Sequence, residues 1–416
     1  MDKIIIKGNN PLRGSVKISG AKNAVLPVMA ATLLTPGKFT IHKVPDLRDT
    51  RTMMKLLNII GAKTKYENGK LIIDTISANN PEAPYDLVKT MRASFYVLGP
   101  LISRFGRVNV SLPGGCAWGP RPVDYHLKGL EKLGADLNLE KGNILAEAEN
   151  LIGSDIHFEF PSVGATGNLA MAAVKAKGIT KLYNCAKEPE ITQLCQFLNS
   201  MGANIEGVGT ETLVIKGVKE LSPADIEIIP DRIEAGTFLI AGALLGEITV
   251  EDVLPEHLDN VINKLRDTGC KLTSTKNSVT IIPTKDIKSV DMTTAVFPGF
   301  PTDLQAQWVA LMSLANGSSV ITDTVYHDRF SHIPELSRFG ANIKVENNSA
   351  FIRGVKSFVA APVMSTDIRA SASLIIAALA AEGETQISRV YHIDRGYENI
   401  EQKFKSLGAN IFRKTD

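Results

Sequence analysis

The sequence predicts an α/β protein of six repeats, each with two helices and four strands, arranged as three repeats in each of two lobes. A helix-end motif recurs six times, as IGAK, LGAD, MGAN, TGCK, FGAN and LGAN. Successive copies are 67 to 73 residues apart. A period of this regularity indicates one structural unit repeated along the chain. The glycines of the motif are Gly61, Gly134, Gly202, Gly269, Gly340 and Gly408.

Each repeat has the same expected order of elements. A glycine just after a helix takes the left-handed conformation that ends it, and the alternating residues that follow, as in ANIKVENNSAFIRG, predict a hairpin of two strands. A second set of glycines each ends an apolar helix and opens a short β-branched strand, as in GKFTIHKV. These glycines are Gly37, Gly106, Gly178, Gly246, Gly317 and Gly383.

The two ends of the chain are expected to meet. The last repeat stops after one strand of its hairpin, and DKIIIKG at residues 2–8 matches the closing strands TLVIKG at 212–217 and AFIRG at 350–354. We therefore expect the first strand to complete the sixth repeat. Residues 21–229 then form the first lobe, and residues 1–20 plus 230–416 form the second. An open solenoid of six units is the alternative, but a donated N-terminal strand favours closed lobes.

Composition excludes several classes of function. The 416 residues are 44% hydrophobic and 22% charged, and the net charge is only +2. Such a chain has no global field for nucleic acid or an anionic membrane. The N-terminal apolar run is too short for a signal peptide and no segment reaches the length of a membrane span, so we expect a cytoplasmic protein. Four scattered cysteines without CxxC or HExxH indicate reduced thiols and no metal site.

The loop LPGGCAWGPRPVD at residues 112–124 predicts a reactive cysteine. Its glycines permit close backbone approach and its prolines stiffen the segment, so Cys116 can be held outside the core. The positive charge of Arg121 favours the thiolate, and Cys116 could act as an acid or as a nucleophile. The remaining cysteines lie in apolar runs and are expected to be buried hydrophobic residues; they are Cys185, Cys195 and Cys270.

Five motifs together resemble a known family. They are PGGCxxGxRPxD, SGAKNAVLP at 19–27, PGFPTDLQAQ at 298–307, DIRASASL at 367–374 and HIDRGYE at 392–398. Along the whole chain the sequence resembles the UDP-N-acetylglucosamine 1-carboxyvinyltransferase family of the EPSP synthase superfamily. The resemblance implies a two-lobed inside-out α/β barrel of six βαβαββ repeats, with helices inside and sheets outside.

The resemblance also implies the reaction and its setting. Phosphoenolpyruvate would donate its enolpyruvyl group to the 3-hydroxyl of UDP-N-acetylglucosamine and release phosphate, which is the first committed step of peptidoglycan precursor synthesis. Cys116 would attack the epoxide of the antibiotic fosfomycin and be trapped covalently. No cofactor is implied, and neither GxGxxG after a strand nor a P-loop occurs in the sequence.

Phosphoenolpyruvate is an anion, so its site requires cations. Arginine presents a planar fork that fits phosphate and carboxylate, although an isolated arginine is usually a solvated surface residue. The resemblance assigns the phosphate to Lys22, Arg121 and Arg395, with Asn23 beside Lys22. It assigns the carboxylate of the enolpyruvyl group to Arg329 and Arg369.

Two carboxylates are candidates for proton transfer. The resemblance implies that Asp303 meets the sugar hydroxyl as a general base, and that Asp367 handles the proton near the methylene group. For both residues the alternative is a helix N-cap, since aspartate commonly precedes an apolar helix. For Asp367, capping and catalysis could coexist.

The nucleotide is expected on the first lobe. SVGATGN at residues 162–168 puts small residues ahead of a helix, where free backbone N–H groups can meet a diphosphate. The chain departs from the family pattern at His327 and Asp328, where a Glu-Asn pair is usual, and at Phe160, near which a basic residue is usual. The resemblance assigns the sugar-nucleotide contacts to Arg92, Arg121, Pro122, Val123, Asp124, Tyr125, Ser162, Val163, Gly164, Asp303 and Val325.

Two other functions remain open at this point. The sister reaction on shikimate 3-phosphate uses the same fold and the same donor, but the sister enzymes lack the cysteine of the PGGC loop. A non-catalytic UDP-sugar sensor would have lost at least one of Lys22, Cys116, Asp303 or Arg395, and the sequence contains all four.

Overall fold

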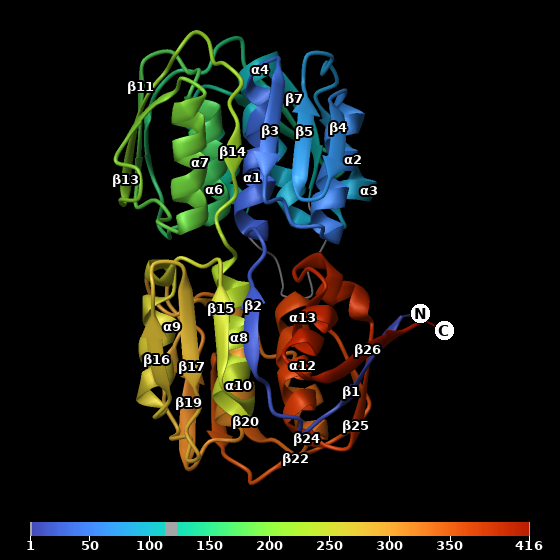
Figure 1. Ribbon diagram of the computed structural model, residues 1–416. Coiled ribbons are helices and arrows are strands. Elements are labelled where there is room, and N and C mark those ends of the chain that lie inside the picture. The colour runs from blue at the N-terminus through green and yellow to red at the C-terminus, as the bar shows by residue number, and fades with distance from the viewer. Residues whose placement is uncertain (1, 113–122, 416) are drawn as a thin grey trace. The chain divides into compact units, whose positions relative to one another are not determined.

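A computed structural model describes residues 2–112 and 123–415, which form two compact units (Figure 1). The chain divides between Ser19 and Gly20 and again between Ile229 and Pro230. We call residues 20–229 the first lobe and the remaining described residues the second lobe. Each lobe has a hydrophobic core of its own.

Six four-stranded sheets of one design confirm the expected repeats. In each of these sheets of the described residues, an edge strand pairs in parallel with a second strand, and the second and third and the third and fourth strands pair antiparallel. Side chains alternate between a buried and an exposed face, as in Lys38–His42. The first lobe contains the sheets β14(Ile226–Glu227)-β3(Lys38–His42)-β5(Lys70–Asp74)-β4(Lys63–Glu67), β6(Glu82–Ala83)-β7(Arg107–Ser111)-β9(Asn143–Glu147)-β8(Asp136–Glu140) and β10(Asp155–His157)-β11(Ile179–Tyr183)-β13(Thr212–Lys216)-β12(Asn204–Glu206).

The second lobe repeats this design and adds a two-stranded sheet. Its four-stranded sheets are β2(Gly14–Lys17)-β15(Ile248–Glu251)-β17(Ser278–Ile282)-β16(Lys271–Ser274), β18(Met292–Thr293)-β19(Ser318–Thr322)-β21(Ser349–Arg353)-β20(Asn342–Glu346) and β23(Val363–Met364)-β25(Glu384–Ser388)-β1(Lys3–Lys7)-β26(Asn410–Lys414). The small sheet pairs β22(Phe358–Val359) with β24(Ala381–Glu382). The sheets remain separate layers.

One helix of each repeat is buried almost all round and forms the inside of its lobe. In the second lobe, three such helices pack against one another and each contacts the inner face of a sheet. Their residues are apolar on nearly every side, which is typical of helices enclosed in a core. These inner helices are α1(Lys22–Ala31), α4(Leu98–Phe105) and α6(Val163–Ala173) in the first lobe, and α8(Arg232–Leu245), α10(Gln305–Met312) and α12(Ile368–Ala380) in the second.

The other helix of each repeat precedes the hairpin. Several of these helices bury one face only, as the alternation of buried and exposed residues in α2 and α9 shows. They are α2(Arg48–Ile60), α5(Asp124–Lys132), α7(Pro189–Ser200), α9(Asp259–Asp267), α11(Ile333–Arg338) and α13(Ile400–Ser406). Shorter helical segments are α3(Tyr85–Val88) and the 3-10 helices η1(Thr32–Leu34), η2(Arg92–Val97), η3(Pro255–His257), η4(Thr302–Leu304) and η5(Val390–Arg395).

The N-terminal strand lies inside the last sheet. β1 pairs antiparallel with β25 on one side, with Ile6 opposite Thr385, and with β26 on the other, with Lys3 opposite Lys414. Figure 1 shows the blue strand β1 beside the red strands β25 and β26. All twelve glycines that mark the repeats have positive φ, as the sequence predicts.

Candidate functional site

Asp303 and two arginines form the most tightly coupled charged group at the predicted site residues. Asp303 lies in η4, and its carboxylate accepts from Arg329 Nη2 at 2.9 Å and from Arg369 Nη2 at 2.8 Å. Each oxygen atom thus faces one guanidinium. The arginines are nearly buried, 8% and 5% exposed, whereas the Asp303 side chain is 24% exposed. The carboxylate is therefore more accessible than the two guanidinium groups that hold it.

The two arginines determine the charge of Asp303. Burial by itself raises the pKa of Asp303, but the positive charges of Arg369 and Arg329 outweigh it, and this pKa lies well below its usual range. The pKa of Arg369 is raised, because Asp303 outweighs the opposing effect of burial. Asp303 and Arg369 are therefore both ionised. The helix-capping alternative for Asp303 does not hold, since its carboxylate turns to the arginines.

Asp323 organises the loop behind this pair, and sequence reasoning missed it. This buried carboxylate accepts from the hydroxyl of Thr302 at 2.6 Å and from the backbone N–H groups of Val325 and Tyr326. Thr302 in turn accepts from Arg329 Nη1 at 3.0 Å. Asp323 thus fixes Arg329 and the predicted contact residue Val325 through one set of hydrogen bonds. An aspartate directly after strand β19 was the available signal.

Asp367 is the N-cap of helix α12. Its Oδ1 accepts from the backbone N–H groups of Arg369 at 2.8 Å and Ala370 at 3.1 Å. The cap starts the helix that carries Arg369, so it fixes the backbone from which that guanidinium extends. The capping role considered from the sequence is confirmed, while a role in proton transfer stays a prediction.

Lys22 is held by a carboxylate that the sequence did not single out. Lys22 begins α1, is 8% exposed, and its Nζ lies 2.7 Å from Oδ2 of Asp49 in the first turn of α2. Lys22 also lies at the N-terminal end of a helix, where the backbone dipole adds positive potential. Asn23 follows it and is partly buried. A buried ion pair of this kind holds the ammonium group in one place.

Two of the predicted nucleotide-binding segments of the first lobe meet at the start of α6. Ser162 caps this helix by accepting from the N–H of Ala165 at 3.3 Å. Gly164 lies against the His126 ring, since a Cβ there would be 3.2 Å from Nε2. Tyr125 packs edge-on against Phe158. The segments 123–126 and 162–165 are therefore neighbours.

His126 is a second residue that sequence reasoning missed. Asn168 accepts from Gly99 N through Oδ1, so its amide nitrogen is the atom that faces Phe95 O and His126 Nδ1, at 2.8 and 3.0 Å. The ring proton must then be on Nε2, the atom nearest Gly164. Burial and the charge of Arg92 lower the pKa of His126 to about 3, so the ring is neutral.

The remaining predicted residues are at the ends of elements. Arg92 begins η2 and Arg395 ends η5, and both are partly buried. Val123 directly precedes α5, Asp124 begins α5, and Val163 begins α6. Cys116, Arg121 and Pro122 lie outside the described residues. The three cysteines expected in the core, Cys185, Cys195 and Cys270, are buried.

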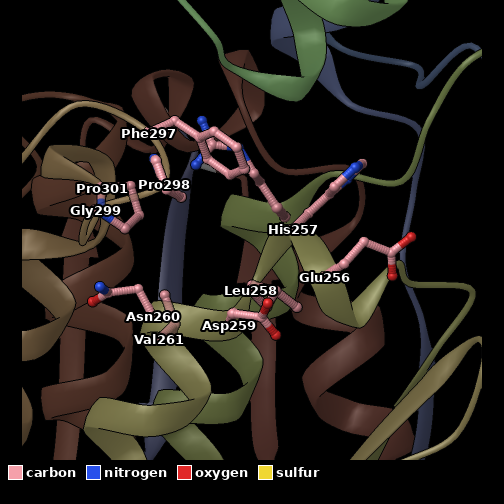
Figure 2. A pocket seen from close by; sticks show the side chains of 11 residues that line it. Glu256, His257, Leu258, Asp259, Asn260, Val261, Phe297, Pro298, Gly299 and Pro301 are labelled. Atoms are coloured by element: carbon pink, nitrogen blue, oxygen red, sulfur yellow. The ribbon is translucent and has the colours of Figure 1, made fainter. Parts of the chain in front are cut away.

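A small cavity in the second lobe is separate from these residues. It lies between the loop that precedes Asp303 and the beginning of α9 (Figure 2), and its volume is about 40 Å³. Ligand pockets usually measure about 300 Å³ or more, so this cavity suits a few water molecules. It is lined by Arg232, Glu256, His257, Leu258, Asp259, Asn260, Val261, Phe297, Pro298, Gly299 and Pro301.

Residues 2–112 and 123–415 contain neither a candidate metal cluster nor a membrane-spanning helix. Within these ranges no three His, Cys, Asp or Glu side chains are grouped so that they could hold a metal ion. No helix of the described chain is both long enough and apolar enough to span a membrane.

Comparison with known proteins gives full-length matches. The family model described as EPSP synthase (3-phosphoshikimate 1-carboxyvinyltransferase) matches residues 6–404. Proteins named UDP-N-acetylglucosamine 1-carboxyvinyltransferase match the whole chain, at 54% identity in Chloroherpeton thalassium, with 98% of that protein covered, and at 51% in Desulfosudis oleivorans, with 100% covered.

Solved structures agree with these matches. The enolpyruvyl transferase NikO from Streptomyces tendae is 26% identical and has a TM-score of 0.90, with 100% of this chain and 99% of that chain covered. EPSP synthase from Acinetobacter baumannii is 18% identical with a TM-score of 0.77 over both full chains, and shows the fold alone. The chain therefore belongs to the EPSP synthase family and, within it, to the UDP-N-acetylglucosamine 1-carboxyvinyltransferases.

Proposed function

We propose that this enzyme transfers the enolpyruvyl group of phosphoenolpyruvate to the 3-hydroxyl of UDP-N-acetylglucosamine and releases phosphate. The observation that carries the proposal is the convergence of Arg329 and Arg369 on the one carboxylate of Asp303. Two nearly buried guanidinium groups aimed at one carboxylate position suit a small ligand that carries a carboxylate. The names of the full-length relatives supply the acceptor.

The reaction needs an acid, a base and a set of cations. The methylene carbon of phosphoenolpyruvate takes a proton while the sugar oxygen bonds to the neighbouring carbon and gives its own proton to a base. Loss of a methyl proton and of phosphate then restores the double bond. We assign the base to Asp303, proton handling at the methylene group to Asp367, and the acid to Cys116. Lys22, Asn23, Arg121 and Arg395 would bind the phosphate.

The pairing of Asp303 with two arginines suggests that binding of the substrate turns Asp303 into a stronger base. While both arginines hold its carboxylate, Asp303 is a weak base, because its pKa is low. A substrate carboxylate that binds Arg329 and Arg369 would compete for the same N–H groups. Loss of these two contacts raises the basicity of Asp303 at the moment when the donor is in place.

The acceptor has its own predicted contact residues. We assign the sugar nucleotide to Arg92, to residues 121–125 and 162–164, and to Asp303 and Val325. The neutral His126 between these two segments is suited to donate a hydrogen bond through Nε2. The reaction would serve peptidoglycan precursor synthesis, and with it cell-wall biogenesis, cell shape and cell division, in the cytoplasm.

The test is phosphate release from phosphoenolpyruvate with two acceptors in parallel. We expect release with UDP-N-acetylglucosamine, with a product heavier by one enolpyruvyl group, and none with shikimate 3-phosphate. Release with shikimate 3-phosphate alone would assign the sister reaction. Tight binding of UDP-N-acetylglucosamine without release would indicate a sensor. Fosfomycin should modify Cys116 and leave the buried Cys185, Cys195 and Cys270 unmodified.

A further inference from the structure

Three buried polar side chains meet behind Asp303 and Arg369. Thr237 comes from α8, Gln307 from α10, and Tyr397 from the segment after η5. They are 0%, 0% and 2% exposed. The hydroxyls of Thr237 and Tyr397 are 3.0 Å apart, and Gln307 Nε2 lies 3.1 Å from the first and 3.2 Å from the second. The cluster thus links two inner helices and the chain that follows η5.

The hydrogen-bond directions in the cluster follow from its surroundings. Thr237 donates its hydroxyl hydrogen to Ile233 O at 2.8 Å, so it can only accept from Tyr397, which therefore donates. Gln307 also lies 3.2 Å from the carbonyl oxygen of Asp303, an atom that only accepts. The Gln307 atom there must be the N–H group and not the amide oxygen. Each hydroxyl thus has one defined donor role.

The cluster contacts the candidate site at two points. Gln307 binds the backbone carbonyl of Asp303, the residue that carries the paired carboxylate. The guanidinium carbon of Arg369 lies 5.6 Å from the centre of the Tyr397 ring, a distance typical of a cation–π contact. Burial raises the pKa of Tyr397, so its phenol keeps the proton it donates. One hydrogen-bonded network therefore contacts both members of the ion pair, Arg369 and Asp303.

A purely structural role does not account for these residue types. Apolar side chains of similar size usually fill a helix core at no loss of stability, whereas buried polar groups must all be paired. Here Gln307 Oε1 is buried with no protein partner among the described residues. The Gln307 side chain therefore leaves its buried Oε1 without a hydrogen bond from the described residues, while its amide N–H donates to the backbone of Asp303.

We propose that Tyr397, Gln307 and Thr237 are positioning residues that set Arg369 and Asp303 for binding of the phosphoenolpyruvate carboxylate. This inference rests on the proposed function. In this role the three residues would act through the guanidinium above the Tyr397 ring and through the backbone at Asp303. Their loss should therefore affect the use of phosphoenolpyruvate more than that of the sugar nucleotide.

The test uses conservative variants and a matched control in the same lobe. Tyr397→Phe keeps the ring and removes the hydroxyl, Thr237→Val removes the hydroxyl at constant shape, and Gln307→Met removes the amide. Thr237→Ser restores a hydroxyl and should rescue. Thr268→Val is the control, because Thr268 is equally buried and its hydroxyl also donates to a helix carbonyl, that of Leu265.

The readouts are KM for each substrate, kcat and the melting temperature. Loss of one or two such hydrogen bonds should raise KM for phosphoenolpyruvate roughly three- to tenfold in the first three variants. KM for UDP-N-acetylglucosamine should stay within about twofold, and Thr237→Ser should lie near the wild type. Thr268→Val should lower only the melting temperature.

Each other outcome overturns a defined statement. If the wild type turns over and Tyr397→Phe, Thr237→Val and Gln307→Met keep KM for phosphoenolpyruvate, the positioning role is wrong and the proposed function stands. The same holds if both KM values rise together, or if the melting temperature alone falls. If the wild type releases no phosphate with UDP-N-acetylglucosamine, the proposed function fails and takes this inference with it. Should Gln307→Met not fold, the Tyr397 and Thr237 variants still decide.

Discussion

At the scale of single residues, a substitution of Asp303 can distinguish a role in substrate binding from a role in the chemical step. We expect Asp303→Asn to keep the shape of the side chain and to lose its charge and basicity. Turnover should fall by about 10² to 10⁴, the usual effect of losing a general base. Affinity for UDP-N-acetylglucosamine should change much less, since its uridine and diphosphate contacts are assigned elsewhere. Initial rates and calorimetry measure the two effects.

A substitution at the surface serves as the control for removal of a negative charge alone. Asp86→Asn removes an exposed carboxylate that pairs with Lys89 at 2.6 Å, and it should leave both quantities unchanged. If Asp303→Asn abolished nucleotide binding and kept the rate at saturation, Asp303 would be a sugar-binding residue and not the base.

Asp367 allows capping and catalysis to be separated, because asparagine caps helices about as well as aspartate. We expect Asp367→Asn to keep the unfolding free energy within about 0.5 kcal/mol and Asp367→Ala to lose about 1 kcal/mol. If Asp367 handles a proton, both variants lose turnover. Normal turnover in Asp367→Asn would leave Asp367 with the cap of α12 alone. Chemical denaturation and initial rates give the answer.

His332 makes the stability of the second lobe depend on pH. It is 1% exposed, and burial together with the charge of Arg329 lowers its pKa to about 3. Between that value and its ordinary pKa, about 6.5, the unfolded chain binds a proton that the folded chain does not. The stability from neutral His332 is therefore complete above about pH 6.5 and is lost as the pH falls toward 3.

Replacing His332 by a residue that does not titrate should make the unfolding free energy depend less on pH. At pH 5 the protonation of unfolded His332 should cost up to about 2 kcal/mol relative to pH 7.5. His332→Phe should lack this part of the loss, and the exposed His327→Phe should retain it. Denaturant unfolding at both pH values makes the comparison. Equal pH dependence in the two variants would contradict the assignment.

At the scale of elements, a hydrogen bond closes the repeat. In five of the six repeats, the residue after the last strand of the repeat donates its backbone N–H to a glycine carbonyl. That glycine directly precedes the strand with which the last strand pairs. These pairs are Gly8 to Gly383, Thr75 to Gly37, Ala148 to Gly106, Gly217 to Gly178 and Gly354 to Gly317, at 2.8 to 3.0 Å. The fourth repeat has Pro283 at this position, and proline has no N–H to donate.

The closing glycine at residue 217 is required by a close approach of two backbones. A Cβ on Gly217 would lie 1.6 Å from the carbonyl oxygen of Ala176, an atom that cannot move aside. Gly217→Ala should therefore cost about 3 kcal/mol of unfolding free energy. At Gly202, where φ is +101° and nothing lies within 4 Å of a Cβ, alanine should cost only about 1 kcal/mol. Equal losses would show that the close approach at Gly217 is relieved at little cost.

The sequence predicted these elements better than the contacts among them. Glycines with positive φ recur at every repeat, so the period and the hairpins are visible in one sequence. The family resemblance likewise indicated Asp303, Arg329 and Arg369, of which Asp303 and Arg369 lie in the quoted motifs. Whether a buried polar side chain within an apolar helix, such as Gln307, meets a tyrosine from another repeat depends on tertiary packing. Spacing along the chain carries no signal for it.

At the scale of the whole molecule, the chain's first strand is part of the last repeat. β1 lies between β25 and β26, and its Ile4 and Ile6 are fully buried in the core of the second lobe. The likeness of residues 2–8 to two other closing strands predicted this position, because equivalent strands of a repeat face equivalent cores. The small sheet of β22 and β24 has no such counterpart among the described repeats, so periodicity could not predict it.

Because of this arrangement, a residue near the N-terminus should control the stability of a lobe in which most residues lie more than 220 positions away. Ile6→Ala removes a fully buried side chain and should cost about 2 to 5 kcal/mol. Ile59→Ala, at a side chain that is 45% exposed on α2, should cost less than about 1 kcal/mol. Hydrogen exchange resolved by peptide should show the effect of Ile6→Ala mainly in the second lobe, and most strongly in β25 and β26, whose backbone groups pair with β1. Unchanged exchange in these two strands would mean that they are held by the core helices alone and that the N-terminal strand adds no stability to the last repeat.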